Sequence, residues 1–109
     1  MMIKYIEVDS DNLIICPELH DGRIQKVFLK KTNQVLLVCE ECEWAWFSLE
    51  ELFVEKSCID FVTYLEDEGY ITTEGSNDWD SILKYGDFVK FDEVKDIVEK
   101  YGIRVVVIE

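Results

Sequence analysis

Proline, histidine and basic residues are scarce in this sequence, which has one Pro and one His, and 11 Lys and Arg against 24 Asp and Glu. The formal net charge of −13 argues against direct binding to nucleic acid, because phosphate recognition needs a basic surface. The five glycines are not clustered, so no phosphate-binding loop is present. No GxSxG or HExxH segment occurs either. We therefore predict a protein that is not an enzyme.

Long apolar runs are also missing. No stretch approaches the length of a membrane-spanning helix, and the first six residues lack the length and the cleavage site of a signal peptide. We therefore expect a cytoplasmic protein without a membrane partner. With 109 residues and 49% hydrophobic content, the chain is expected to form a single domain, residues 1–109, around a modest core.

The first 39 residues favour β-strands. Four short apolar stretches occur there, at residues 2–8, 12–16, 24–30 and 34–39. The last two flank a hairpin turn in which Asn33 tolerates the left-handed region. Pro17 and Gly22 predict a tight irregular loop between the second stretch and the third.

Helices are predicted after residue 47. Ser48 and Glu51 fit a capping box. A second helix start is predicted at Ser57, with Cys58 on its buried apolar face and Gly69 at its end.

Two more helices share the same C-terminal tripeptide. A short helix is expected to be capped by Ser76 or Asn77 and to end at Lys84-Tyr85-Gly86. A last helix is expected to be capped by Asp92 and to end at Lys100-Tyr101-Gly102. The apolar stretch 103–108 is expected to form a strand inside a sheet. Such a strand could also form a dimer contact, so a monomer and a dimer are both possible. The predicted fold class is α+β, with N-terminal antiparallel hairpins, three to four helices and a C-terminal strand.

Cysteine and histidine occur at spacings that suit a metal. Cys39 and Cys42 form a CxxC pair, and Cys16 and His20 lie upstream with eighteen residues between His20 and Cys39. Zinc prefers thiolate and imidazole ligands in a tetrahedron, often as two short-spaced pairs. The predicted zinc ligands are Cys16, His20, Cys39 and Cys42. Four protein ligands leave no position for water, so the zinc is predicted to be structural.

Residues 13–47 resemble a zinc ribbon, a family in which two knuckles at the tips of a β-hairpin share one zinc. The matching features are Cys16-Pro17 and Gly22 in the first knuckle and Cys39 to Cys42 as the second. The resemblance implies that the four residues at these positions are the ligands. The first knuckle of that family closes on a cysteine, whereas here His20 sits one place further on, where its longer side chain can absorb the extra residue.

Two other uses of the cysteines stay open. Cys39 and Cys42 can be small buried residues at a strand end, with His20 exposed in a loop. A redox pair is disfavoured, because a reactive thiol needs a lowered pKa, whereas the neighbouring carboxylates Glu40, Glu41 and Glu43 favour the protonated thiol.

Negative charge is concentrated in one part of the chain. Residues 40–80 carry thirteen Asp and Glu against Lys56 alone. Such a run is either a solvated face or a docking face for a basic partner. Tryptophans in the same segment can anchor an interface or join the core. The predicted partner contacts are Glu50, Glu51, Glu55, Glu66, Asp67, Trp44, Trp46 and Trp79.

Two functions follow from these patterns. In size, charge and general build the chain resembles bacterial immunity proteins of contact-dependent inhibition and other polymorphic toxin systems, which implies an acidic inhibitor that covers a basic toxin domain, for example a nuclease. The alternative is a zinc-ribbon adaptor or regulator in a transcription or translation complex. Its basis for touching nucleic acid is thin, since Lys26, Lys30 and Lys31 are the only basic cluster near the knuckles.

Overall fold

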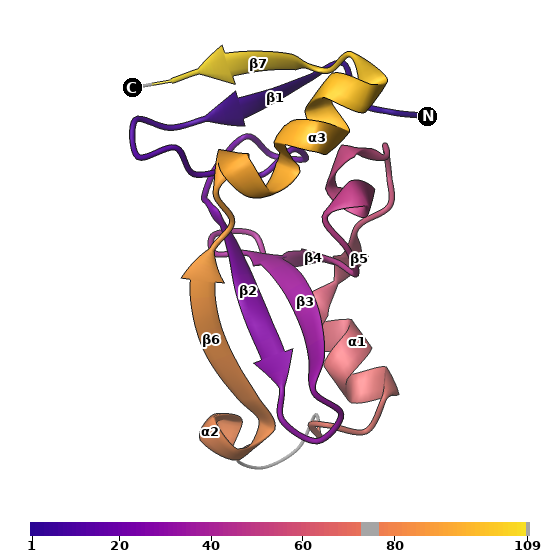
Figure 1. Ribbon diagram of the computed structural model, residues 1–109. Coiled ribbons are helices and arrows are strands. Elements are labelled where there is room, and N and C mark those ends of the chain that lie inside the picture. Colours follow the sequence, from indigo (N-terminus) through magenta and orange to yellow (C-terminus); the bar gives the residue numbers. More distant parts are fainter. Residues whose placement is uncertain (73–76, 109) are drawn as a thin grey trace.

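The computed structural model describes residues 1–72 and 77–108 and has an α+β fold, in which a five-stranded antiparallel sheet is the largest element (Figure 1). The order of its strands is β5-β4-β3-β2-β6. Their bounds are β2 Ile24–Leu29, β3 Gln34–Cys39, β4 Trp44–Trp46, β5 Ile59–Asp60 and β6 Leu83–Phe88. The predicted hairpin is confirmed, since β2 pairs with β3 across a turn in which Asn33 has φ +58.

A second sheet lies across one end of the first (Figure 1). It contains two parallel strands, β1 (Tyr5–Val8) and β7 (Arg104–Val107). The expectation that residues 103–108 lie inside a sheet is wrong, because β7 pairs with β1 alone and Val107 is 70% exposed. The apolar sequence of residues 103–108 is instead explained by packing on one side, because Ile103 and Val105 contact the core.

Three α-helices occur in the described residues, α1 (Phe61–Asp67), α2 (Trp79–Ile82) and α3 (Phe91–Tyr101). The helix predicted after Ser48 is a single turn of 3-10 helix, η1 (Glu50–Phe53), in which Ser48 Oγ accepts the N–H of Glu51 as expected. None of the described helices is long and apolar enough to cross a membrane.

Helix α1 begins later than predicted. Ile59 and Asp60 pair with β4, and Asp60 caps the helix by accepting the N–H of Thr63 at 3.0 Å. Cys58 therefore precedes the helix and does not lie on its face. The predicted end is confirmed, because Gly69 has φ +78 just after the last turn.

The helix predicted to end at Lys84-Tyr85-Gly86 is also corrected. Helix α2 stops at Ile82, and the tripeptide lies in β6, which pairs with β2. Asn77 does not cap α2, since its side chain instead exchanges two hydrogen bonds of 3.0 Å with the backbone of Thr72. The alternative cap, Ser76, lies outside the described residues.

Helix α3 begins at Phe91 with Lys90 as its N-cap, so the prediction that Asp92 caps the helix is wrong and Asp92 lies inside the first turn. The carboxylate of Glu93 accepts the backbone N–H of Lys90 at 3.0 Å, which secures the first turn. The helix ends at Gly102, whose φ of +62 confirms the predicted terminus.

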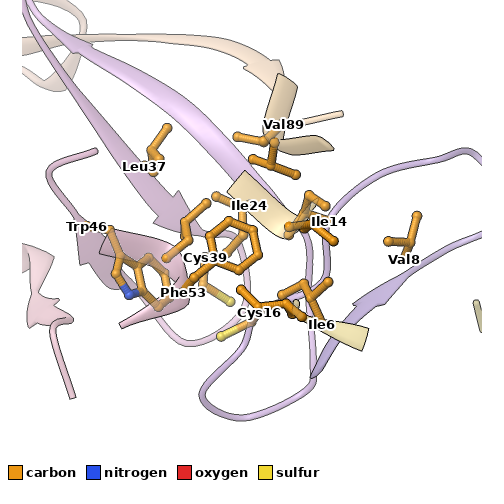
Figure 2. Close-up of a cluster of buried hydrophobic side chains, with 14 residues drawn as sticks. Ile6, Val8, Ile14, Cys16, Ile24, Leu37, Cys39, Trp46, Phe53 and Val89 are labelled. Atoms are coloured by element: carbon orange, nitrogen blue, oxygen red, sulfur yellow. The ribbon is translucent and has the colours of Figure 1, made fainter. Parts of the chain in front are cut away.

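Two clusters of buried side chains pack on the two faces of the large sheet. One joins β1, β2, β3, β4, η1 and α3 and contains Trp46, Phe53, Cys16 and Cys39 (Figure 2). The other lies between the sheet and α1, and includes Leu36 and Val38. Both faces of β3 are thus covered, which explains why its sequence is a continuous apolar run. The cysteine loops lie at the edge of the first cluster.

Candidate metal centre

Three thiols converge where the first core cluster meets the cysteine loops. The Sγ atoms of Cys16, Cys39 and Cys42 all lie within 4.8 Å of one another, and those of Cys16 and Cys42 are 3.7 Å apart. Figure 2 shows the sulfur atoms of Cys16 and Cys39 close together beneath Phe53. All three cysteines are free. This arrangement can hold a metal ion, and it confirms that the two distant cysteine loops form one cluster.

The first loop is closed by its own backbone. The N–H of Cys16 donates to the carbonyl of Gly22 at 2.9 Å, and the N–H of His20 donates to the carbonyl of Cys16 at 3.0 Å. His20 and Gly22 both adopt positive φ, at +55 and +82. The tight loop predicted from Pro17 and Gly22 is confirmed, and it presents Cys16 to the core side.

The second loop turns at the end of β3. The N–H of Glu43 donates to the carbonyl of Cys39 at 3.1 Å, and Glu43 has φ +59. This turn reverses the chain before β4 and brings Cys42 back beside Cys39. The two loops are also joined directly, because the N–H of Glu40 donates to the carbonyl of Arg23 at 3.0 Å.

His20 does not join the three thiols. Its Nδ1 lies 2.6 Å from the Glu7 Oε1, and its ring stacks on Tyr5 with centroids 5.6 Å apart. The left-handed backbone at His20 directs the side chain away from the cysteines toward β1. The structure therefore brings together three of the four predicted ligands and corrects the placement of the fourth.

The surroundings of Cys16 and Cys42 favour the protonated form of these two thiols. Burial raises the pKa of the Cys16 thiol. Burial, together with hydrogen bonds to Cys39 and Cys16, raises the pKa of Cys42 to about 12. A reactive redox thiol needs the opposite shift, so the geometry argues against that use. A divalent cation in the cluster would supply the positive charge that thiolates need.

The three tryptophans predicted to contact a partner lie in different environments. Trp46 is fully buried in the first core cluster, so its assignment to a partner surface is corrected to a core role. Trp44 is half-buried and packs against the same cluster. Trp79, on α2, is 42% exposed. Of the three, Trp79 presents the most surface to a partner.

The predicted acidic contacts do not form one continuous set. Glu50 accepts a hydrogen bond from the hydroxyl of Tyr101 at 2.7 Å, and Glu51 accepts one from the N–H of Phe47 at 3.1 Å. Glu55 is exposed beyond η1. Glu66 and Asp67 lie in the last turn of α1, a helix with no basic residue in that turn. Two of the five carboxylates thus have structural contacts within the chain.

Sequence reasoning missed a groove of about 540 Å³ on the sheet face that α1 partly covers. Its lining includes Phe61, Val62, Trp79, Tyr85, Glu40 and Glu43. Tyr85 is 60% exposed and lies in β6, although the sequence of its segment is typical of a helix end. Cys39 also borders this groove, so the groove adjoins the thiol cluster.

The fold and the site together define a small α+β domain with a three-cysteine cluster and an acidic, aromatic groove beside it. Comparison with known protein families, with curated proteins and with solved structures finds no match to this chain. The geometry of these two sites is therefore the basis on which a function can be proposed.

Proposed function

We propose that this chain is a non-enzymatic acidic domain that binds a basic protein partner and is stabilised by a zinc ion at Cys16, Cys39 and Cys42. The partner proposal rests on the distribution of ion pairs along the chain. They join His20 to Glu7, Arg23 to Asp9 and Asp11, and Lys26 to Glu93. Within residues 40–72 and 77–80, no carboxylate forms an ion pair. That segment keeps its negative charge available to a partner.

The zinc proposal is supported by the chemistry of the donors. Thiolate sulfur is a preferred zinc ligand, and two loops that each contribute cysteines are typical of structural zinc sites. The loops are brought together by backbone hydrogen bonds that need no metal, such as the one from Glu40 to Arg23. Zinc would therefore bind a site that the fold has largely prepared.

The groove offers a specific place for a basic side chain. Trp79 and Tyr85 expose aromatic surface there, and Glu40 and Glu43 line the same groove, whose lining contains no Lys or Arg. Aromatic faces and carboxylates both attract Arg and Lys. We place the centre of the partner contact at this groove in preference to the carboxylates of η1, because Trp79 and Tyr85, which are 42% and 60% exposed, line it beside Glu40 and Glu43.

The finer proposal is that the partner is a bacterial toxin domain and that the chain is its immunity protein. The small size, the net charge of −13 and the unpaired acidic segment support it. Carboxylates would occupy the positions at which a nuclease toxin binds the phosphates of its substrate, so association would be fast and sensitive to salt. Burial of Trp79 and Tyr85 would slow release of the partner.

A zinc-ribbon adaptor is the second candidate, because the cysteine loops meet at the end of a β-hairpin as in that family. Its basic strand is poorly available, however. Lys26 pairs with Glu93, and Lys30 donates to the backbone carbonyl of Asp80. Few free cations then remain near the knuckles to contact nucleic acid.

The immunity proposal predicts that a toxin domain is encoded beside the gene of this chain, and co-expression with that domain tests the proposal. The chain should restore growth and bind the purified toxin domain with an on-rate that falls as salt rises. Failure to restore growth together with failure to bind would contradict it. Binding of duplex DNA or RNA at physiological salt would favour the adaptor instead.

A separate measurement tests the zinc proposal. Native mass spectrometry of the chain, purified without chelator, should show about one zinc per chain. Cys39→Ser should remove that zinc, while His20→Gln should keep it. A metal-free wild-type chain that also fails to take up added zinc would overturn the proposal.

A further inference from the structure

Three thiols leave one of the four positions of a tetrahedral zinc site open. His20, the only histidine of the chain, is directed to Glu7 and Tyr5. One cysteine remains, Cys58, which sequence reasoning placed on the buried face of a helix. The structure places it elsewhere, directly before β5.

The pairing of β5 with β4 determines which way Cys58 faces. Ile59 is opposite Ala45 in this ladder, and both belong to the core between the sheet and α1. Neighbouring residues of a strand face opposite sides. Cys58 accordingly packs against the other core cluster, the one that contains Cys16 and Cys39 and that Cys42 also contacts.

The position of Cys58 relative to the thiols follows from packing. Cys58 and Cys42 are both half-buried, and both pack against the core cluster that contains the buried Cys16 and Cys39. Cys58 lies outside the group of three cysteines whose sulfur atoms are within 4.8 Å of one another.

We propose that Cys58 is the fourth ligand, so that zinc is bound by the thiolates of Cys16, Cys39, Cys42 and Cys58. This inference rests on the zinc site proposed above. On binding, each of the four thiols loses its proton to solvent, and the four thiolates replace water around Zn²⁺. The Cys58 side chain moves toward Cys42 to close the tetrahedron.

The fourth bond would couple the metal to the proposed partner surface. Cys58 precedes Phe61 and Val62 by three and four residues, and both of these line the groove. Cys39, at the end of β3 on the other side of β4, also borders the groove. A zinc ion held by both residues would therefore fix the strand β5 and the start of α1 against β3 and β4. Metal loading would make the groove more rigid.

Cobalt substitution of the full-length chain tests the assignment, because the intensity of the thiolate-to-cobalt absorption follows the number of Co–S bonds. We expect four such bonds in the wild type. Cys58→Ser should lower that intensity by about a quarter while the protein still binds cobalt, since the variant keeps the three thiols whose sulfur atoms already lie within 4.8 Å of one another, whereas Cys39→Ser and Cys42→Ser break up this group. His20→Gln and Glu18→Gln should leave the intensity unchanged. X-ray absorption at the zinc edge should likewise count four sulfur neighbours in the wild type and three in Cys58→Ser.

The outcomes separate this inference from the zinc proposal itself. If Cys58→Ser keeps the wild-type spectrum, Cys58 is not a ligand and the inference is overturned, whichever residue holds the fourth position. If the wild type takes up neither cobalt nor zinc, the zinc proposal fails first. Circular dichroism of Cys58→Ser without metal should match the wild type, which separates a lost ligand from a lost fold.

Discussion

Gly22 of the first cysteine loop lies directly against Cys39 of the second. A Cβ atom on Gly22 would be 3.1 Å from the Cys39 Sγ and 2.6 Å from the Cγ of Glu41. Gly22 also has φ +82, in the left-handed region. Only a residue without a side chain allows the two loops to approach this closely, so the thiol cluster depends on Gly22.

Gly22→Ala should therefore destabilise the domain and weaken zinc binding. The left-handed backbone and the displaced Glu41 side chain together should cost about 1–3 kcal/mol in the free energy of unfolding. Urea denaturation and competition with a zinc-binding dye would measure the two effects. Gly69→Ala is the matched control, because Gly69 has φ +78 with nothing within 4 Å of an added Cβ. It should lose about 1 kcal/mol and keep its zinc affinity. Equal zinc affinities in Gly22→Ala and the wild type would contradict this role.

Removing zinc should lower the melting temperature without abolishing the fold. A ligand that binds only the folded state stabilises it by about 4 kcal/mol when its free concentration is about a thousand times its Kd. Differential scanning calorimetry with and without a chelator would show the shift. Cys42→Ser should melt at the same temperature in both conditions, whereas His20→Gln should respond like the wild type. A chelator that leaves the wild-type transition unmoved would argue for thiols that serve only as core residues.

Changes in the groove should affect partner binding more than changes elsewhere on the acidic surface. Glu43→Lys should slow association with the toxin domain by about tenfold at low salt, because it reverses a charge in the groove lining. Trp79→Ala should speed dissociation. Surface plasmon resonance at two salt concentrations measures both rates. Glu55→Lys makes the same charge change beyond η1 and is the control. A larger effect from Glu55→Lys than from Glu43→Lys would move the contact to the η1 side.

Asp9 should make folding sensitive to acid. Burial acts to raise the pKa of Asp9, but the N–H groups of Leu13 and Asp11 and the Arg23 guanidinium outweigh it, so the pKa is lowered. A carboxyl with a lowered pKa in the folded state contributes stability above the unfolded value of about 4, and this is lost as the pH falls through the folded pKa.

Asp9→Asn should thus lose about 1 kcal/mol at pH 7 and show a weaker loss of stability below pH 4 than the wild type. Urea midpoints measured from pH 2 to pH 7 provide the test. Asp87→Asn is the control, since this exposed side chain forms no hydrogen bond or ion pair with residues 1–72 or 77–108, and the pH profile of the variant should follow the wild type. An unchanged acid limb in Asp9→Asn would contradict the assignment.

Local sequence signals determined the parts of this protein whose conformation is set by near neighbours. Asn33 specifies the turn of the β2–β3 hairpin, Pro17 and Gly22 specify the first cysteine loop, and Gly102 ends α3. The cluster of Cys16, Cys39 and Cys42 follows for the same reason, because their loops are short and lie at the paired start of β2 and end of β3.

The tripeptide Lys-Tyr-Gly shows that local sequence signals do not always determine secondary structure. At residues 100–102 it ends helix α3, and at residues 84–86 it lies in strand β6. The second copy pairs with β2, and Gly86 is so close to the Phe28 ring that an added Cβ would be 2.6 Å from it. Nothing in the tripeptide itself distinguishes the two cases, because the partner strand lies about sixty residues away in the sequence.

The tertiary structure likewise decided the surroundings of the metal centre. His20 is held by Glu7, and Cys58 faces the thiol cluster because β5 pairs with β4. Tyr85 reaches the groove only because β6 joins the sheet. Composition and spacing alone determined the acidic character, the α+β class and the three thiols. The long-range strand pairings, whose stability comes from packing between distant segments, decided which side chains surround the three thiols.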